Sequence, residues 1–193
     1  YNINDAINFI ILNFDIKRNL YNQWIIKLCP GLYQEKEINV PPFISLIGYG
    51  NENTYIEVEN VKLGSNTKLK NLTLLIKNKI TIDSKIIDNK LLGKEFRLTD
   101  LIKMENIILK NEVFESETMI DINNGNLEIK DCNIEIKCIE NKINDRNMID
   151  LGIGCKLTII NSNIEVKNSN IKTSIINCKY SDIIIRNSNL KID

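Results

Sequence analysis

The chain has 193 residues, a length that suits a single domain with a sizeable core. Its 25 basic and 25 acidic residues balance, so strong non-specific attraction to nucleic acid or to an anionic membrane surface is not expected. Every apolar run is shorter than the roughly 20 residues that cross a bilayer, so we expect no membrane span.

The composition strongly favours strands over helices. Ile occurs 38 times and Ala only once, at Ala6. β-branched side chains fit strands well and helices poorly, and they dominate this chain. Asn and Lys are also frequent, and all three types have A/T-rich codons, so part of this bias can come from the genome.

The N-terminal segment carries a helical pattern. Asn4 or Asp5 is predicted to cap a helix over about Ala6 to Phe14. Its apolar stripe at helical spacing consists of Ile7, Ile10, Ile11 and Phe14. We interpret residues 1–20 as a helical cap over one end of the domain.

From Trp24 the pattern changes to short strands separated by turns. The turn Cys29-Pro30-Gly31 and the breaker pair Pro41-Pro42 punctuate them. The predicted strands in this part are Trp24–Leu28, Glu37–Val40, Phe43–Ile47, Thr54–Val58, Val61–Leu63 and Leu69–Ile76.

A repeated unit then organises the rest of the chain. Leu157–Val166 (LTIINSNIEV) has near-copies at Leu127–Ile136 and Ile183–Ile192, and looser versions at Lys103–Lys110 and Lys68–Leu75. Aligning one Asn per unit gives steps of 35, 27, 30 and 26 residues between Asn71, Asn106, Asn133, Asn163 and Asn189. Short units recurring at such steps are typical of a solenoid.

Apolar alternation continues on both sides of each Asn, which favours a single-stranded parallel β-helix over the alternative, a leucine-rich repeat with one strand per repeat. We expect one all-β domain over 1–193, with about seven coils in 24–193 and an irregular insertion near 77–95. The five aligned Asn residues are expected at corners, where they adopt left-handed backbone and form a hydrogen-bonded structural ladder.

The segment Trp24–Glu57 carries two motifs together. The first has Pro30, Gly31, Tyr33 and Glu35, and the second has Leu46, Ile47, Gly48 and Gly50. This segment resembles the first coils of the pectin lyase-like superfamily of right-handed parallel β-helices and is most similar to its pectin-methylesterase branch. The resemblance implies a right-handed β-helix.

Enzymes of that superfamily act on acidic polysaccharides, but their catalytic segments do not recur here. The sequence lacks segments like Gln-Asp-Thr-Leu, Asp-Phe-Ile-Phe-Gly and Leu-Gly-Arg-Pro-Trp, and it contains no His. The resemblance therefore supplies no catalytic and no cofactor-binding residue. A Ser-His-Asp triad is excluded because it needs a His.

Two carboxylates are the weak candidates for a metal site. Asp121 in MIDI and Asp150 in MIDL occupy equivalent positions, with Asn177 next in line. Two carboxylates one coil apart either hold a cation such as Ca²⁺ or remain solvated beside lysines. We favour the solvated ladder, because calcium needs six or more oxygen ligands and the others cannot be named.

The remaining motifs have structural interpretations. The five cysteines are odd in number and without metal-ligand spacing, so we expect buried reduced thiols, while a Cys132–Cys155 disulfide stays open; the other three are Cys29, Cys138 and Cys178. The sequon Asn71-Leu72-Thr73 is interpreted as incidental, because Asn71 is a predicted corner.

These patterns favour a non-enzymatic structural or surface protein, such as a viral virion, fibre or capsid-associated component, or a glycan-recognition scaffold. The alternative is a pectate lyase-like or pectinesterase-like enzyme acting on acidic glycans. The last coil, to Ile192, carries no cap of its own, so we expect self-association, for example as a homotrimer, or contact with neighbouring subunits. The expected location is a virion or cell surface, and assembly in a reducing cytoplasm is compatible with the cysteines.

Overall fold

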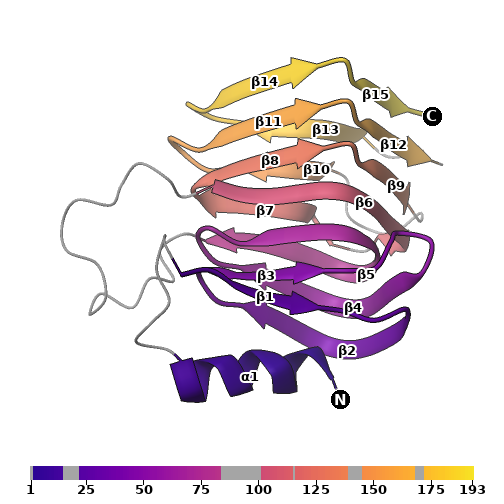
Figure 1. The fold of residues 1–193 in the computed structure, drawn as a ribbon. Helices are drawn as coiled ribbons and strands as arrows, with labels where there is room; N and C mark the ends of the chain where they lie inside the picture. The colour runs from indigo at the N-terminus through magenta and orange to yellow at the C-terminus, as the bar shows by residue number, and fades with distance from the viewer. Residues whose placement is uncertain (1, 15–21, 84–100, 115, 139–144, 168–171) are drawn as a thin grey trace.

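The computed structural model describes residues 2–14, 22–83, 101–114, 116–138, 145–167 and 172–193. One helix, α1 (Ile3–Phe14), precedes the strands (Figure 1). The predicted all-β class with an N-terminal helix is confirmed. The strands are β1 (Trp24–Lys27), β2 (Gly31–Val40), β3 (Ile44–Ile47), β4 (Thr54–Leu63), β5 (Lys68–Asp83), β6 (Leu101–Phe114), β7 (Thr118–Asn124), β8 (Asn126–Lys130), β9 (Asn133–Cys138), β10 (Asp145–Leu151), β11 (Lys156–Ile160), β12 (Asn163–Lys167), β13 (Lys172–Cys178), β14 (Asp182–Arg186) and β15 (Asn189–Ile192).

The strands pair in parallel and form one curled sheet with three faces (Figure 1). Face A contains β1, β3, the start of β5, the start of β6, β8, β11 and β14, in that order. Face B contains the first half of β2, the first half of β4, the middle of β5, the end of β6, β9, β12 and β15. Face C contains the ends of β2, β4 and β5, then β7, β10 and β13.

The chain visits the faces in the order A, B, C and then returns to face A beside the strand it left. Each such passage is called a repeat, and the seven strands of face A start repeats 1 to 7. A leucine-rich repeat would have one strand per repeat. Here a repeat such as Asn126–Leu151 contributes three, namely β8, β9 and β10, so that alternative is wrong.

The core lies inside the curl and is built by alternation along each strand. Ile134 pairs with Ile164, and Ile136 with Val166, in adjacent strands of face B. All four are at most 1% exposed. Because successive side chains of a strand point to opposite faces, one residue in two reaches this core and its neighbours face solvent. Ile, Leu and Val supply most of the buried side chains.

The corner between faces A and B needs a left-handed residue in most repeats. Five residues with φ near +50° occupy it: Asn71, Asn106, Asp131, Asn161 and Asn187. Asn and Asp tolerate this conformation better than other residues with a side chain.

The helix α1 covers the N-terminal end of the column (Figure 1). Its buried side chains are Ile3, Ile7 and Ile10. The amide N–H of Asp5 donates to the side-chain oxygen of Asn2 at 2.6 Å. The N-cap is therefore Asn2 rather than the predicted Asn4 or Asp5, and the helix starts three residues earlier than expected.

The predicted insertion near 77–95 is partly wrong. Residues 77–83 belong to β5, and within them 79–83 pair with β4 and β7, with one register shift against each. The other residues of that prediction, 84–95, lie outside the described residues. Within the described part of the chain, the structure contains no helix with the length and apolar character to span a membrane.

Candidate recognition groove

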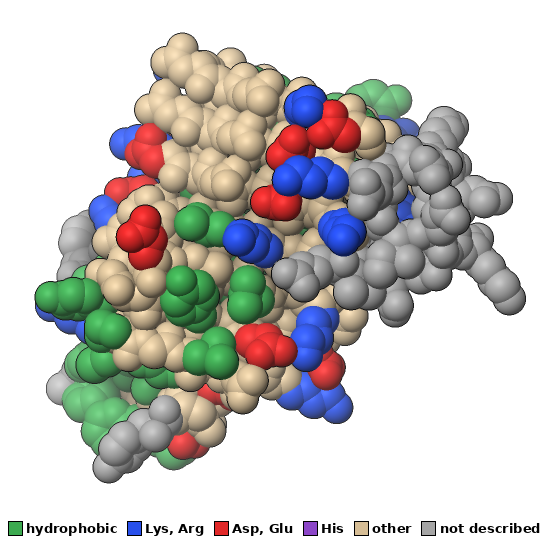
Figure 2. All heavy atoms as spheres, turned by 90° about the vertical axis from the view of Figure 1, so that its right-hand side faces the viewer, with side chains coloured by type: hydrophobic (Ala, Val, Ile, Leu, Met, Phe, Trp, Pro, Cys, Tyr) green, Lys and Arg blue, Asp and Glu red, His purple; other side chains and the backbone are tan. Residues whose placement is uncertain are grey.

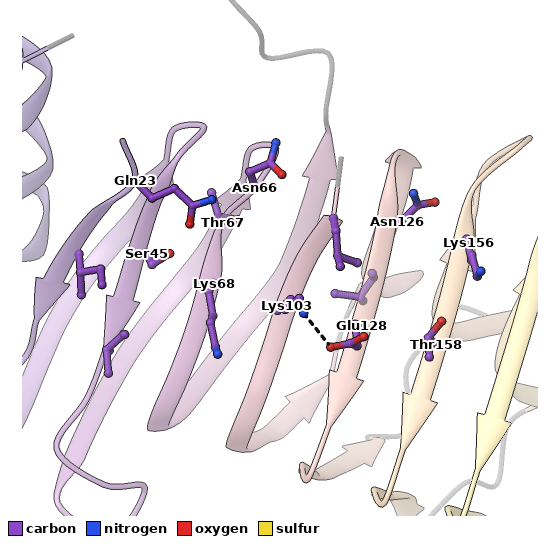
Figure 3. Close-up of a pocket in the computed structure, with 14 residues that line it drawn as sticks. Gln23, Ser45, Asn66, Thr67, Lys68, Lys103, Asn126, Glu128, Lys156 and Thr158 are labelled. Carbon is purple, nitrogen blue, oxygen red and sulfur yellow. Dashed lines mark ion pairs between the residues drawn. The ribbon is translucent and has the colours of Figure 1, made fainter. Parts of the chain in front are cut away.

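An open groove of about 760 Å³ runs across the outer surface of face A. Six neighbouring strands line it: β1, β3, β5, β6, β8 and β11. Figure 3 shows its labelled residues, among which Lys68, Lys103, Glu128 and Thr158 lie at similar heights on neighbouring strands. Its polar lining consists of Gln23, Ser45, Asn66, Thr67, Lys68, Lys103, Asn126, Glu128, Lys156 and Thr158.

The strand register explains why these side chains lie side by side. Ser45 pairs with Lys68, Lys68 with Lys103, Lys103 with Glu128, and Glu128 with Thr158. Parallel strands in register place equivalent residues one above the other at about 4.8 Å. The groove floor is therefore a column of outward-facing side chains that crosses the strands.

Ion pairs hold part of this surface in place. The Lys103 ammonium lies 3.3 Å from Glu128, as Figure 3 shows. Lys68 of the groove and Lys70 beside it both contact the Glu105 carboxylate. Hydrogen bonds from these two lysines lower the pKa of Glu105 from 4.5 to about 2. This carboxylate therefore stays ionised across the physiological range.

Lys156 differs from the other lysines of the groove. It is exposed, and its ammonium makes no ion pair with any residue that the structure describes. The lining contains three lysines and one glutamate, so its formal charge is +3 − 1 = +2. The groove thus combines amide and hydroxyl groups with a cation that is available to a ligand.

The candidate metal residues lie on face C, away from the groove. The register puts Asp150 directly beside Asp121, and Asn177 beside Asp150. Lys79 lies 3.6 Å from Asp121, and the Asn177 amide donates to Asp150 at 2.8 Å. Among the described residues no group of three or more potential ligands was found. The geometry is that of a hydrogen-bonded surface ladder.

The five aligned Asn residues lie in two separate columns. This corrects the prediction that they form a single ladder at the corners. Asn71 and Asn106 occupy the left-handed corner, and the Asn106 amide donates to Asn71 at 2.9 Å. Asn133, Asn163 and Asn189 lie two residues beyond that corner, at the starts of β9, β12 and β15. They form their own ladder, with hydrogen bonds of 3.1 and 2.9 Å.

The corner column that contains Asn71 and Asn106 continues beside this ladder through Asp131, Asn161 and Asn187. The Asn161 amide donates to Asp131 at 3.1 Å, and Asn187 donates to Asn161 at 3.4 Å. The N-x-N spacing in NSN and the D-x-N spacing in DCN were the sequence signals for two columns. The alignment used only the second member of each pair.

The motif residues near the N-terminus hold the first repeats and the helix together. The Glu35 carboxylate accepts hydrogen bonds from the Ile3 N–H at 2.7 Å and from the Asn4 amide at 2.9 Å. Tyr33 donates through its hydroxyl to the Cys29 carbonyl at 3.1 Å. A Cβ at Gly48 would overlap the Asn71 carbonyl oxygen, so only glycine fits there. These motif residues therefore have structural roles in this chain.

The cysteines are only partly as predicted. Cys132 and Cys155 are buried and free, while Cys29 and Cys178 are free and exposed, so the prediction of buried thiols is wrong for these two. Burial raises the pKa of Cys132 to about 11 and also raises the pKa of Cys155. The side chain of Cys138 lies outside the described residues.

The outer surface of face B differs from the groove. Figure 2 shows the side of the column on which β9, β12 and β15 lie, with hydrophobic side chains gathered over its lower half and charged ones above. The exposed apolar residues of β2 and β4 are Leu32 and Tyr55, which pair directly. Farther along this face, Lys167 lies 2.9 Å from Glu135 and 3.4 Å from Glu165. A smaller pocket of about 430 Å³ lies at the helix end of this face, where Leu32, Tyr33, Gln34 and Glu35 of β2 meet Asn2 and Asp5.

No family model, no curated protein and no solved structure matches this chain.

Proposed function

We propose that this chain is a right-handed parallel β-helix of the pectin lyase-like type that acts as a non-catalytic scaffold and binds an extended acidic glycan along face A. The handedness follows from a general rule: a connection between parallel strands of one sheet is right-handed in about 98% of cases. The parallel pairing of every face A strand with its neighbours supports this proposal.

The groove is the observation that carries the binding function. Five strands, β3, β5, β6, β8 and β11, present hydrogen-bonding side chains in one column, at a spacing of about 4.8 Å. A periodic surface of this kind suits a polymer that lies across the strands and repeats its own polar groups. A compact ligand would use only one or two of these positions.

The charge of the groove favours acidic sugars. Its lining has a formal charge of +2, and Lys156 is not engaged in an ion pair with a described residue. Lys103 and Lys68 are already paired with carboxylates, which fixes their positions but reduces their attraction for a ligand. Lys156 is therefore the residue expected to contribute most to binding.

A scaffold role is supported by how the outer charges are used. Glu105 contacts two lysines, Glu135 contacts Lys167 of the next repeat, and Glu165 contacts Lys191 of the repeat after that, so these carboxylates connect neighbouring repeats. The chain also contains no His to act as a base or acid near neutral pH. Both features favour recognition over the alternative of a pectate lyase-like or pectinesterase-like enzyme.

The composition supports a setting for this scaffold. The Ile, Asn and Lys bias fits an A/T-rich genome such as that of some viruses, which favours a virion or other surface component. Self-association or contact with neighbouring subunits belongs to the same proposal. The redox state of the cysteines is compatible with assembly in a reducing compartment.

The test is titration of the purified chain with oligogalacturonate, followed by calorimetry at low and high salt. We expect binding that weakens as salt increases and that weakens strongly in Lys156→Ala. The matched control is Lys137→Ala, which removes an exposed lysine from face B and leaves the groove intact. Equal effects of the two variants, or no binding to acidic oligosaccharides, would disprove the groove proposal.

The same mixture distinguishes recognition from catalysis. A lyase would release unsaturated uronates, which absorb in the ultraviolet, and an esterase would release acid from a methylated substrate. We expect neither signal at high protein concentration. A steady rise in either one that depends on the protein would replace the scaffold proposal with the enzyme alternative.

A further inference from the structure

The end of the column opposite α1 exposes core positions. In the described part of the chain, β13, β14 and β15 each pair with only one other strand. Ile183 and Ile185 are 37% and 43% exposed, although the residues they pair with, Leu157 and Ile159, are 0% exposed. Ile192 is 45% exposed, against 1% for its neighbour Val166. This end therefore presents both apolar side chains and an open strand edge.

We propose that this end binds the same end of a second copy of the chain, in a two-fold symmetric dimer in which β14 pairs antiparallel with its copy. A head-to-tail contact would need the opposite end of the column. There α1 covers the core with Ile3, Ile7 and Ile10, so that end offers no apolar cross-section. Association through one surface on both copies is isologous and closes as a dimer.

The sequence of β14 is complementary to itself in charge. It reads Asp182-Ile183-Ile184-Ile185-Arg186, with an acid at one end and a base at the other. In an antiparallel pair that overlaps all five residues, Ile184 lies opposite Ile184 of the second copy. Asp182 then lies opposite Arg186 of the second copy, and two such ion pairs form.

The same register keeps inner and outer residues on their proper sides. Residues directly opposite each other in an antiparallel pair point to the same face. Ile183 therefore meets Ile185 of the second copy inside the column, where their counterparts in lower repeats are buried. The outward Asp182 and Arg186 meet outside it. Neither residue has an ion pair with another described residue, so both charges are available.

The two neighbouring edges fit the same symmetry. The axis passes between the two copies of β14, at Ile184, and is perpendicular to face A and to the column, so it exchanges faces B and C. The free edge of β15 in one copy then lies beside β13 of the other. Along the chain β13 precedes β14 and β15 follows it, so the open edge of the column rises in steps from face C through face A to face B. The edge of the second copy steps in the opposite sense, so the facing strands of the two copies are equally far apart on all three faces. This surface adjoins the groove, because Asp182 and Ile184 pair with Lys156 and Thr158, but the proposal does not depend on glycan binding.

The first test compares charge variants of the 193-residue chain by light scattering over a dilution series. Arg186→Asp places like charges opposite each other, so we expect dimerisation to weaken by about 10-fold or more. The double variant Asp182→Arg with Arg186→Asp restores both pairs and should dimerise like the wild type. The matched control is Lys27→Asp, which reverses an exposed charge on the same face in repeat 1.

The second test places a cysteine on the proposed symmetry axis. We expect Ile184→Cys to form a disulfide-linked dimer under mild oxidation. Ile25→Cys, at the corresponding position of β1, should not cross-link beyond the wild-type level. A monomer at all concentrations, dimers that tolerate Arg186→Asp, or equal cross-linking of both cysteine variants would overturn the proposal. If the chain is monomeric at all concentrations, this end binds something else, such as a further strand or a different protein.

Discussion

The side-chain amide of Asn163 donates to the Asn133 oxygen, one repeat below, at 3.1 Å. Asn189 continues the contact from above, donating to Asn163 at 2.9 Å. The same side chain thus bridges three repeats on the outside of the column. Core packing joins the repeats within, and ladders of this kind fix their register at the surface.

The first prediction concerns this ladder. Asn163→Ala removes two hydrogen bonds and Asn189→Ala removes one, at the end of the ladder. With a net contribution of about 0.5–1.5 kcal/mol per bond, the first variant should lose about 1–3 kcal/mol of unfolding free energy and the second about half as much. Urea unfolding followed by circular dichroism measures both. Equal losses would show that the ladder does not act between repeats.

The second prediction concerns acid stability. In the folded state the pKa of Glu105 is lowered from 4.5 to about 2 by hydrogen bonds from Lys68 and Lys70. A lowered folded-state pKa stabilises the fold fully above the unfolded value, and this contribution is lost as the pH falls from about 4.5 through about 2. Glu105→Gln should therefore flatten the fall in stability over this interval.

The control for this experiment is Glu59→Gln, a half-buried carboxylate that makes no ion pair with a described residue. Thermal melts of the three proteins between pH 5 and pH 2 give the comparison. We expect the Glu59 variant to follow the wild type. A Glu105 variant whose melting temperature falls as steeply as that of the wild type would contradict the role of this ion pair.

The third prediction concerns the cap. Ile7 is 2% exposed beneath α1, whereas Leu12 on the same helix is 84% exposed. Ile7→Ala leaves a cavity at the end of the core and should lower the unfolding free energy by about 2–5 kcal/mol. Leu12→Ala makes no cavity and should change it little. If both variants melt together with the wild type, α1 does not close the core.

The fourth prediction concerns thiol reactivity. The thiolate is the reactive form, and burial raises the pKa of Cys132 to about 11. Iodoacetamide should therefore label the exposed Cys29 and Cys178 in the native protein, and Cys132 and Cys155 only after unfolding. Peptide mass spectrometry identifies each site. Fast native labelling of Cys132 would place it outside the core.

The alternation of apolar and polar residues was sufficient to predict the strands and the inner side of each. Residues such as Ile134 and Ile136 are buried because a strand points every second side chain to the same side. The scarcity of Ala and the helical stripe before Phe14 likewise separated α1 from the strands. These features are local, so a single sequence contains them.

The register of the strands could not be predicted from the sequence, because it depends on which strands pair with each other. The aligned Asn residues fell into two columns two residues apart, since either Asn of an NSN turn matches the pattern equally well. The partner of Glu35 was also hidden, because Ile3 lies 32 residues away and its contact exists only once α1 folds over β2.

Sequence alone determined that this chain consists of short strands with alternating apolar and polar residues and a helix in front, because hydrophobic period and composition act within each segment. The tertiary structure decided the groove, since Ser45 and Thr158 reach one surface only through four successive strand pairings. It also decided which charges meet and which remain available, because ion pairs between repeats join residues that no local pattern connects.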